Sequence, residues 1–309
     1  MWLNRSDIAD TFKSKYTEEF LDVIFYRPVG YIIARVSKAI GLTPNAVTII
    51  SIFFGVAAGH LFWYSDFKLN LIGVLMLIFA EALDSADGQL ARLTGSNSKF
   101  GRFLDGFSEN LWFLSIYLHL FFRLIRDGYS PYIIILIVIA GISHSFQSAI
   151  ADYYRNVFTY MVQRKGISEI ENSDKLKQEY SLLNWRNNFG RKLYMRLYIN
   201  YTIQQEVISS QAFSLINYCE LNFSSGIPND IVTMFKNWCS RLIKYYNILT
   251  SNTRMIVLFY AALADNIMIY ILFEIVCLNI LLLYVVFQHE AACRLALQEA
   301  RNYTIGRSL

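Results

Sequence analysis

The sequence predicts an all-α integral membrane protein with about six transmembrane helices and an N-terminal amphipathic helix in the membrane interface. Of its 309 residues, 55% are hydrophobic and only 17% are charged, whereas a soluble domain is nearer a quarter charged. The mean hydropathy is +0.33. The 4 Pro and 15 Gly favour long helices over many turns. These values exclude disordered and disulfide-scaffold proteins, and a net charge of +4 gives no reason to expect a nucleic-acid partner.

The N-terminal part, residues 1–42, is predicted to lie along the membrane interface. Apolar residues recur there at helical spacing among acidic ones, which is typical of an interfacial helix. A second amphipathic piece, residues 29–40, ends at Gly41. Thr43 and Pro44 then predict a helix cap and a first-turn proline, so the first span begins there.

Six apolar stretches are predicted to span the membrane, and the first four have lengths near the ~20 residues that cross a bilayer. The first four cover residues 46–64, 69–83, 103–124 and 132–151, and a final pair lies within residues 255–287. Asp265 and Asn266 interrupt the pair, which predicts a tight turn between two short or tilted spans. One long helix with a re-entrant piece is the alternative.

Residues 164–253 differ in composition, because charged and polar side chains mix there with apolar positions at helical spacing. They predict a cytoplasmic helical insertion that braces the core or binds a partner. The predicted organisation is therefore an interfacial part, four spans, the insertion, and two spans with a tail, at residues 1–42, 43–163, 164–253 and 254–309.

The basic residues predict the orientation. Of the 28 Lys and Arg residues, only Lys68, Arg123 and Arg126 lie in or beside the loops on one side. The remainder lie on the side that holds both termini, the 92–102 loop and the insertion. The positive-inside rule places that side in the cytoplasm, so we expect a protein of the cytoplasmic membrane.

Carboxylates lie where the second and third spans meet the cytoplasm. Such groups near hydrocarbon are costly unless paired or metal-bound, so they are functional candidates. Asp84 and Asp87 share one helical face, and Asp105 and Glu109 share a face of the next helix. The short loop between the helices lets the two faces meet. A set of salt-bridged helix ends is the structural alternative.

This chemistry suggests metal-assisted phosphoryl transfer at a membrane surface. Clustered carboxylate oxygens suit Mg²⁺ or Mn²⁺, which keep positions open for phosphate oxygens. Gly88 and Ala91 leave space beside the carboxylates, and Arg92 adds a phosphate-binding guanidinium. For Gly88 and Ala91, close helix packing is the competing interpretation.

The residues Asp84-x2-Asp87-Gly88-x2-Ala91-Arg92-x8-Gly101-x3-Asp105-x3-Glu109 resemble the signature of the CDP-alcohol phosphotransferase (CDP-alcohol phosphatidyltransferase) family. That signature reads D-x2-D-G-x2-A-R-x8-G-x3-D-x3-D. Every fixed position is matched except the last, where Glu109 stands in place of Asp. The resemblance covers about residues 27–160 well and the last two spans loosely, and it leaves out the insertion.

The resemblance implies an enzyme of phospholipid synthesis that transfers a phosphoalcohol group, expected to be phosphatidyl, from a CDP-linked donor to an acceptor hydroxyl and releases CMP. It implies metal ligands at Asp84, Asp87, Asp105 and Glu109, with Glu109 also activating the acceptor. Gly88, Ala91 and Arg92 would line the nucleotide site, and Asn45 would border it. The resemblance also implies a homodimer, a donor such as CDP-diacylglycerol, and a small alcohol as acceptor, inositol phosphate among the candidates. A catalytically inactive relative that serves as a metal-binding scaffold or binds a partner is the alternative.

Two arginines are candidates for binding an anionic substrate. Arg155 follows a polar stripe on the fourth span that includes His144, Ser148 and Asp152. A local ion pair with Asp152 is the alternative for Arg155. Arg254 opens the fifth span, where an interfacial anchor is the alternative.

Overall fold

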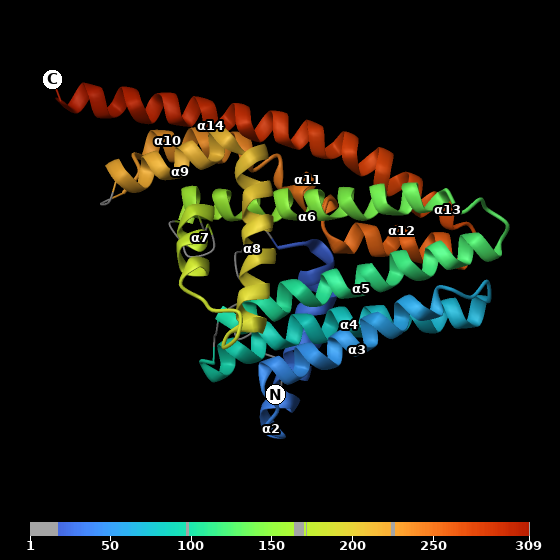
Figure 1. Ribbon diagram of the computed structural model, residues 1–309. Coiled ribbons are helices and arrows are strands. Elements are labelled where there is room, and N and C mark those ends of the chain that lie inside the picture. The colour runs from blue at the N-terminus through green and yellow to red at the C-terminus, as the bar shows by residue number, and fades with distance from the viewer. Residues whose placement is uncertain (1–17, 97–98, 164–169, 171, 224–225, 309) are drawn as a thin grey trace. The chain divides into compact units, whose positions relative to one another are not determined.

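The computed structural model describes residues 18–308 apart from 97–98, 164–169, 171 and 224–225; side chains at 99, 100, 102, 103, 105, 106, 307 and 308 are also outside the description. Every regular element in the described ranges is helical, as predicted (Figure 1). The expected helix over residues 1–17 lies outside them. The chain forms two compact units, one of Met1–Ser143 with Arg254–Ile275 and one of His144–Thr253 with Val276–Leu309. The four-part division of the chain stays a prediction.

The first unit is built from helices that follow one another closely in sequence. They are η1 (Asp22–Tyr26), α2 (Arg27–Ala39), α3 (Pro44–Leu61), α4 (Phe67–Thr94), α5 (Lys99–Arg126), the start of α6 (Ile133–Gln163), most of α12 (Ser251–Leu263), α13 (Ile267–Leu272) and the start of η3 (Phe273–Cys277). The predicted cap is confirmed, because the Thr43 side chain accepts a hydrogen bond from the Ala46 amide at 3.3 Å and Pro44 opens α3.

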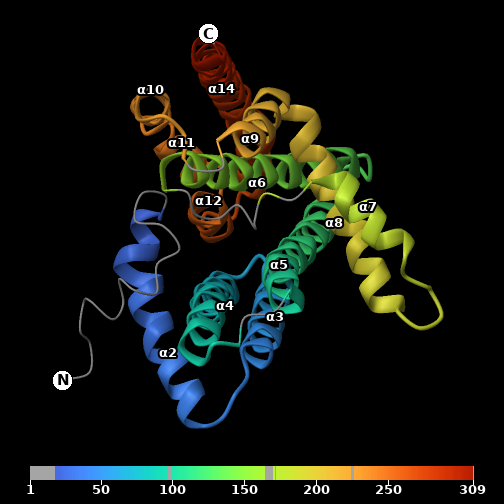
Figure 2. The ribbon, with the colours of Figure 1, turned by 90° about the vertical axis from the view of Figure 1, so that its left-hand side faces the viewer.

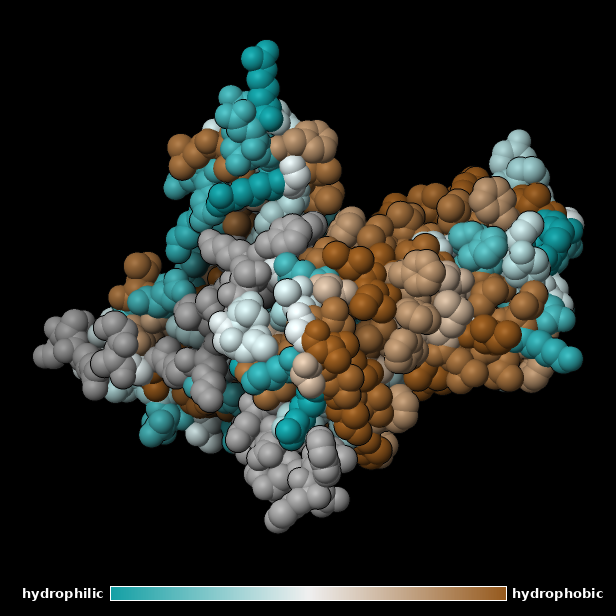
Figure 3. Space-filling model, turned by 90° about the horizontal axis from the view of Figure 1, so that it is seen from below, coloured by the Kyte–Doolittle hydropathy of each residue, from teal (hydrophilic) through white to brown (hydrophobic). Residues whose placement is uncertain are grey.

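Four helices in the described ranges are long and apolar enough to cross a membrane. They are Pro44–Leu61, Phe67–Thr94, Ile133–Gln163 and the continuous segment Ile267–Gly306. Large apolar side chains are exposed on the helices of the first unit, among them Phe53, Leu75 and Leu118. Figure 3 shows such residues as a broad brown area on one face of the molecule. The count of six spans stays a prediction, since α5 and the 13-residue α12 are not among the four.

The predicted turn at Asp265 and Asn266 is confirmed. Helix α12 ends at Leu263, α13 begins at Ile267, and Asp265 has a φ of 54°. The buried Arg123 donates hydrogen bonds to Asp265 Oδ1 at 2.5 Å and to the Phe62 carbonyl at 2.9 Å. Arg123 thus fastens this turn to the ends of α3 and α5, which the sequence did not predict.

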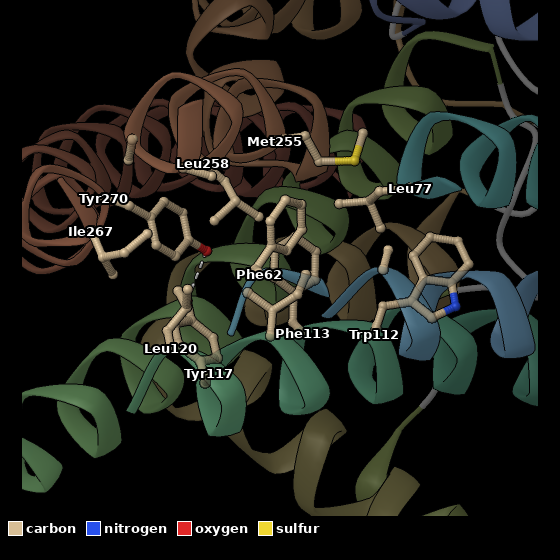
Figure 4. Close-up of a cluster of buried hydrophobic side chains, with 14 of the residues drawn as sticks. Phe62, Leu77, Trp112, Phe113, Tyr117, Leu120, Met255, Leu258, Ile267 and Tyr270 are labelled. Carbon is tan, nitrogen blue, oxygen red and sulfur yellow. Dashed lines mark hydrogen bonds between the residues drawn. The ribbon is translucent and has the colours of Figure 1, made fainter. Parts of the chain in front are cut away.

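Aromatic and aliphatic side chains from α3, α4, α5, α12 and α13 form the core of the first unit. Figure 4 shows Trp112, Tyr117 and Tyr270 within this cluster. The Tyr270 hydroxyl donates to the Tyr117 hydroxyl at 3.3 Å, and the two rings are stacked. The hydrogen bond satisfies polar groups that would otherwise be costly to bury.

Glycine lets α3 approach α5 closely. A Cβ built on Gly55 would lie 2.2 Å from Trp112 Cδ1, whereas one built on Gly141 of α6 would meet its nearest described atom, Tyr117 Cδ2, at 3.8 Å. We therefore expect Gly55→Ala to destabilise the protein by about 1–3 kcal/mol, because the ring must move out of a packed core. The matched change Gly141→Ala should be close to neutral. Thermal unfolding in detergent, followed by tryptophan fluorescence, compares the two; equal midpoints would contradict the close packing.

The second unit contains the helices of the insertion and the long C-terminal helix. They are α7 (Ser173–Ser181), α8 (Phe189–Ile208), α9 (Ser210–Asn222), α10 (Asn229–Cys239), α11 (Ile243–Ile248) and α14 (Leu278–Ser308), together with the end of α6. Both α9 and α10 pack on α14 (Figures 1 and 2). Glu290 of α14 accepts hydrogen bonds from the Gln211 and Ala212 amides at 2.7 and 3.3 Å. The Glu290 carboxylate therefore accepts hydrogen bonds from backbone amides in the first turn of α9, which have no acceptor within the helix.

Candidate functional site

The candidate residues of α4 lie on one uninterrupted helix. The sequence placed the end of the apolar span at residue 83 and a loop over 92–102, but α4 continues to Thr94. Gly95, with a φ of 65°, ends the helix, and α5 begins at Lys99. Asp84 and Asp87 are therefore held on a rigid helix rather than at a frayed span end, and α5 follows after a short connection.

Hydroxyl groups from two other helices contact the α4 carboxylates. The Thr48 hydroxyl of α3 donates to Asp87 Oδ2, and Asp87 is 4% exposed. The Ser108 hydroxyl of α5 donates to Asp84 Oδ1 at 2.9 Å. Each carboxylate is thus held in place by a hydroxyl from a neighbouring helix. The site thus draws on α3, α4 and α5.

The other two candidate carboxylates belong to Asp105 and Glu109, which stand on either side of Ser108 in the sequence of α5. Asp105 is three residues before Ser108 and Glu109 is the next residue after it. Ser108 contacts Asp84, but the expected meeting of the Asp105 and Glu109 face with the Asp84 and Asp87 face stays a prediction. Glu109 is half-buried. The Asp105 side chain is among those outside the description.

The donor atoms at the candidate site are all oxygens. Among the side chains that the structure describes, no group of three or more His, Cys, Asp or Glu is arranged to hold a metal. The Asp105 carboxylate lies outside the described side chains. The residues gathered here supply only oxygen atoms, from carboxylates and hydroxyls, and oxygen ligands suit Mg²⁺ and Mn²⁺ rather than softer metals.

Among the described atoms, none from another helix packs closely against Gly88. The three nearest described atoms to a Cβ built on Gly88 all belong to Arg92, and the closest lie at 3.6 Å. By contrast, a Cβ on Gly59 of α3 would meet Ser115 Oγ at 2.5 Å. Close helix packing therefore explains Gly59 but not Gly88. The exposed Arg92 brings its guanidinium beside Gly88, where it can meet an anion.

Helix α2 supports the same end of α4. The Lys38 ammonium donates to the Leu93 carbonyl at 3.0 Å, and the buried Gln89 amide donates to the Arg27 carbonyl at 3.1 Å. Ala91 and Asn45, which lie on α4 and in the first turn of α3, are both half-buried. Asn45 precedes Thr48 by three residues, so the two share a face of α3.

The two candidate arginines outside the motif have partners within their own units. In the second unit, Arg155 lies 3.8 Å from the Asp152 carboxylate, so the local ion pair is present. In the first unit, Arg254 is fully buried and donates to Glu274 Oε1 at 3.0 Å. This burial does not fit an arginine at the membrane surface. It favours a packing role for Arg254, although its predicted role in substrate binding stays open.

Sequence reasoning missed Thr48 and Ser108, which contact the α4 carboxylates. For each residue, its spacing in the sequence from a candidate site residue could have identified it. Thr48 lies one helical turn after Asn45, and Ser108 lies between Asp105 and Glu109 on the same part of α5. A hydroxyl at helical spacing from candidate carboxylates on an apolar helix is a reasonable partner for them.

Comparison with known proteins agrees with this geometry. Residues 41–168 match the model of the family described as CDP-alcohol phosphatidyltransferase, which confirms the resemblance seen in the motif. The chain is also similar to archaetidylinositol phosphate synthase of Pyrococcus horikoshii, with 36% identity over 79 residues. That similarity covers 26% of this chain and 40% of the relative, so it spans less than half of either protein.

Proposed function

Because residues 41–168 belong to the CDP-alcohol phosphatidyltransferase family, a family of transferases, we propose that this chain is a membrane phosphotransferase of phospholipid synthesis. It moves a phosphoalcohol group, a phosphatidyl-type group in our proposal, from a CDP-linked donor to an acceptor hydroxyl. The observation that carries the proposal is the carboxylate pair Asp84 and Asp87 on α4, each of which accepts a hydrogen bond from a hydroxyl of α5 or α3.

In the proposed reaction, the acceptor oxygen attacks the phosphorus that carries the alcohol of the donor. The bond from that phosphorus to the CMP oxygen breaks, CMP leaves with the electron pair, and Glu109 takes the acceptor proton. Mg²⁺ or Mn²⁺, held by Asp84, Asp87, Asp105 and Glu109, would neutralise charge on the pyrophosphate. Arg92 supplies a further cation, and Asn45 borders the nucleotide.

Glu109 is the position at which this chain departs from the motif. Glutamate has the charge of aspartate but one more methylene, so its oxygen reaches further, and catalysis is sensitive to such a displacement. We propose that the site is shaped around Glu109. An inactive scaffold is the competing function, and Glu109→Asp separates the two: it should lower the activity of a site built for glutamate and raise that of an inactive relative.

We propose inositol phosphate as the first acceptor to test. The support is the similarity to archaetidylinositol phosphate synthase, whose name states that product. The positive-inside pattern supports an active site that faces the cytoplasm. A homodimer is proposed from the family resemblance.

The test is CMP release by the purified protein in lipid vesicles with CDP-diacylglycerol and Mg²⁺ or Mn²⁺. A panel of inositol phosphate, glycerol phosphate, serine and a lipid alcohol identifies the acceptor. We expect release with one acceptor and its loss in a folded Asp105→Asn variant. No release with any acceptor, together with activity that first emerges in Glu109→Asp, would support the inactive relative instead.

Gly88→Ala should lower CMP release by about tenfold to a hundredfold while leaving stability nearly unchanged. Among the described atoms, the added methyl group would meet those of Arg92, at an ordinary contact distance of 3.6 Å, so we expect folding to tolerate it. It would, however, occupy space that the donor needs beside the backbone. Initial rates and unfolding midpoints are measured together. Full activity in a stable Gly88→Ala protein would show that no ligand approaches this position.

A further inference from the structure

Helix α8 of the insertion carries an exposed apolar stripe that the proposed transferase does not use. Phe189, Leu193 and Leu197 are 63%, 42% and 47% exposed. Their four-residue spacing places them on one helical face. Trp185, exposed in the turn before α8, extends the stripe toward the helix N-terminus.

The opposite face of α8 is already packed. Met195 and Ile199 are buried with Leu176 of α7 in a small cluster of their own. Helix α8 therefore has its intramolecular partner, and the stripe is a second apolar face that points away from it. Three large apolar side chains in a row on one helical face, with Trp185 exposed just before them, indicate a binding surface rather than scattered surface residues.

The charged residues of this segment are all basic. Residues 181–205 contain Arg186, Arg191, Lys192 and Arg196 but neither Asp nor Glu. Arg186, Arg191 and Arg196 are exposed, and Arg196 directly precedes Leu197 of the stripe. An apolar face of Trp, Phe and Leu beside basic residues is typical of a helix that lies on an anionic membrane surface.

A hydrogen bond fixes the depth of α8 relative to α6. The Gln205 side-chain amide donates to the Ala149 carbonyl at 2.9 Å. Ala149 lies near the end of the apolar stretch 132–151, where α6 leaves the hydrocarbon. Figures 1 and 2 both draw α8 running across α6 rather than along it. A helix crossing a spanning helix at that level lies near the plane of the membrane interface.

We propose that the stripe of Trp185, Phe189, Leu193 and Leu197 rests on an anionic bilayer surface, with Arg186 and Arg196 on lipid phosphates. The insertion is then a membrane-docking element as well as part of the second unit. Basic residues near such a surface each add to the attraction, and they do so only when anionic lipid is present. The proposal does not depend on the transfer reaction.

The test places a nitroxide spin label at Leu193→Cys in full-length protein that also carries Cys277→Ser, because Cys277 is exposed and the other three cysteines are buried. The matched control is Gln178→Cys on the exposed part of α7. Both proteins are reconstituted into vesicles of phosphatidylcholine with phosphatidylglycerol. Collision with oxygen reports lipid contact, and collision with a water-soluble nickel chelate reports water contact.

We expect the label at 193 to collide mainly with oxygen and the label at 178 mainly with nickel. The double variant Arg186→Glu with Arg196→Glu reverses two charges. It should lower the ratio of docked to undocked protein, reported by the label at 193, on the order of tenfold or more. In vesicles of phosphatidylcholine alone, the ratio of docked to undocked protein at 193 should fall as well. Nickel contact at 193 in anionic vesicles would overturn the proposal, and so would protection from both reagents, which would indicate a covering protein. A second label at Leu197→Cys must give the same result.

Discussion

Replacing Asp87 by Asn should reduce CMP release on the order of a thousandfold, with the protein still folded. Asn keeps the shape of the side chain and an oxygen that accepts the Thr48 hydrogen bond. What it removes is the negative charge that the proposed metal ion needs. The loss should therefore come from chemistry rather than from packing, and initial rates with the identified acceptor measure it.

The control for Asp87→Asn is the same substitution at the other end of α4. Asp66 caps this helix, because its side chain accepts a hydrogen bond from the Leu69 amide at 2.9 Å. Asn is an equally good cap, so Asp66→Asn should keep both stability and activity. If Asp66→Asn and Asp87→Asn lose similar amounts of activity, the effect at Asp87 is not specific to the site.

Replacing Arg254 by Met should destabilise the protein by about 3–5 kcal/mol. Arg254 and Glu274 are both fully buried and form an ion pair at 3.0 Å. Removal of one partner leaves the other charge buried with its main partner gone, which is costly in a protein interior and more so inside a membrane. Unfolding in detergent, followed through the buried Trp112, gives the change in stability.

The double variant Arg254→Met with Glu274→Met tests the pair itself. Because it removes both charges, it should be more stable than Arg254→Met alone. A substrate-binding arginine predicts a different result: Arg254→Met would raise the acceptor KM with little change in stability. That outcome would restore the role that the sequence suggested for Arg254.

The fold was predicted where local chemistry determines it. Thr43 and Pro44 start α3 as expected, and the turn at Asp265 lies between α12 and α13. Hydropathy gave the end of the apolar stretch at residue 83, which is where the chain was expected to leave the hydrocarbon, and the expected loop began at residue 92. Helix α4 continues beyond that point to Gly95, whose positive φ ends it.

The candidate site was predicted only in part, for a physical reason. The acidic residues and Gly88 stand at the spacing of the motif, so the sequence alone identifies them. Thr48 and Ser108 contact Asp87 and Asp84 through bonds that link residues 39 and 24 positions apart, and such contacts depend on how helices pack. The pairing of Arg254 with Glu274 is of the same kind.

The proposed function requires that the α4 and α5 carboxylates together hold divalent ions. Its most direct test is a Mn²⁺ titration of the purified protein, followed by electron paramagnetic resonance, with Asp84→Asn and Asp66→Asn alongside. We expect the unaltered protein and Asp66→Asn to bind Mn²⁺ with the same affinity and Asp84→Asn to bind it at least about tenfold more weakly. Equal Mn²⁺ binding by Asp84→Asn and the unaltered protein would contradict it.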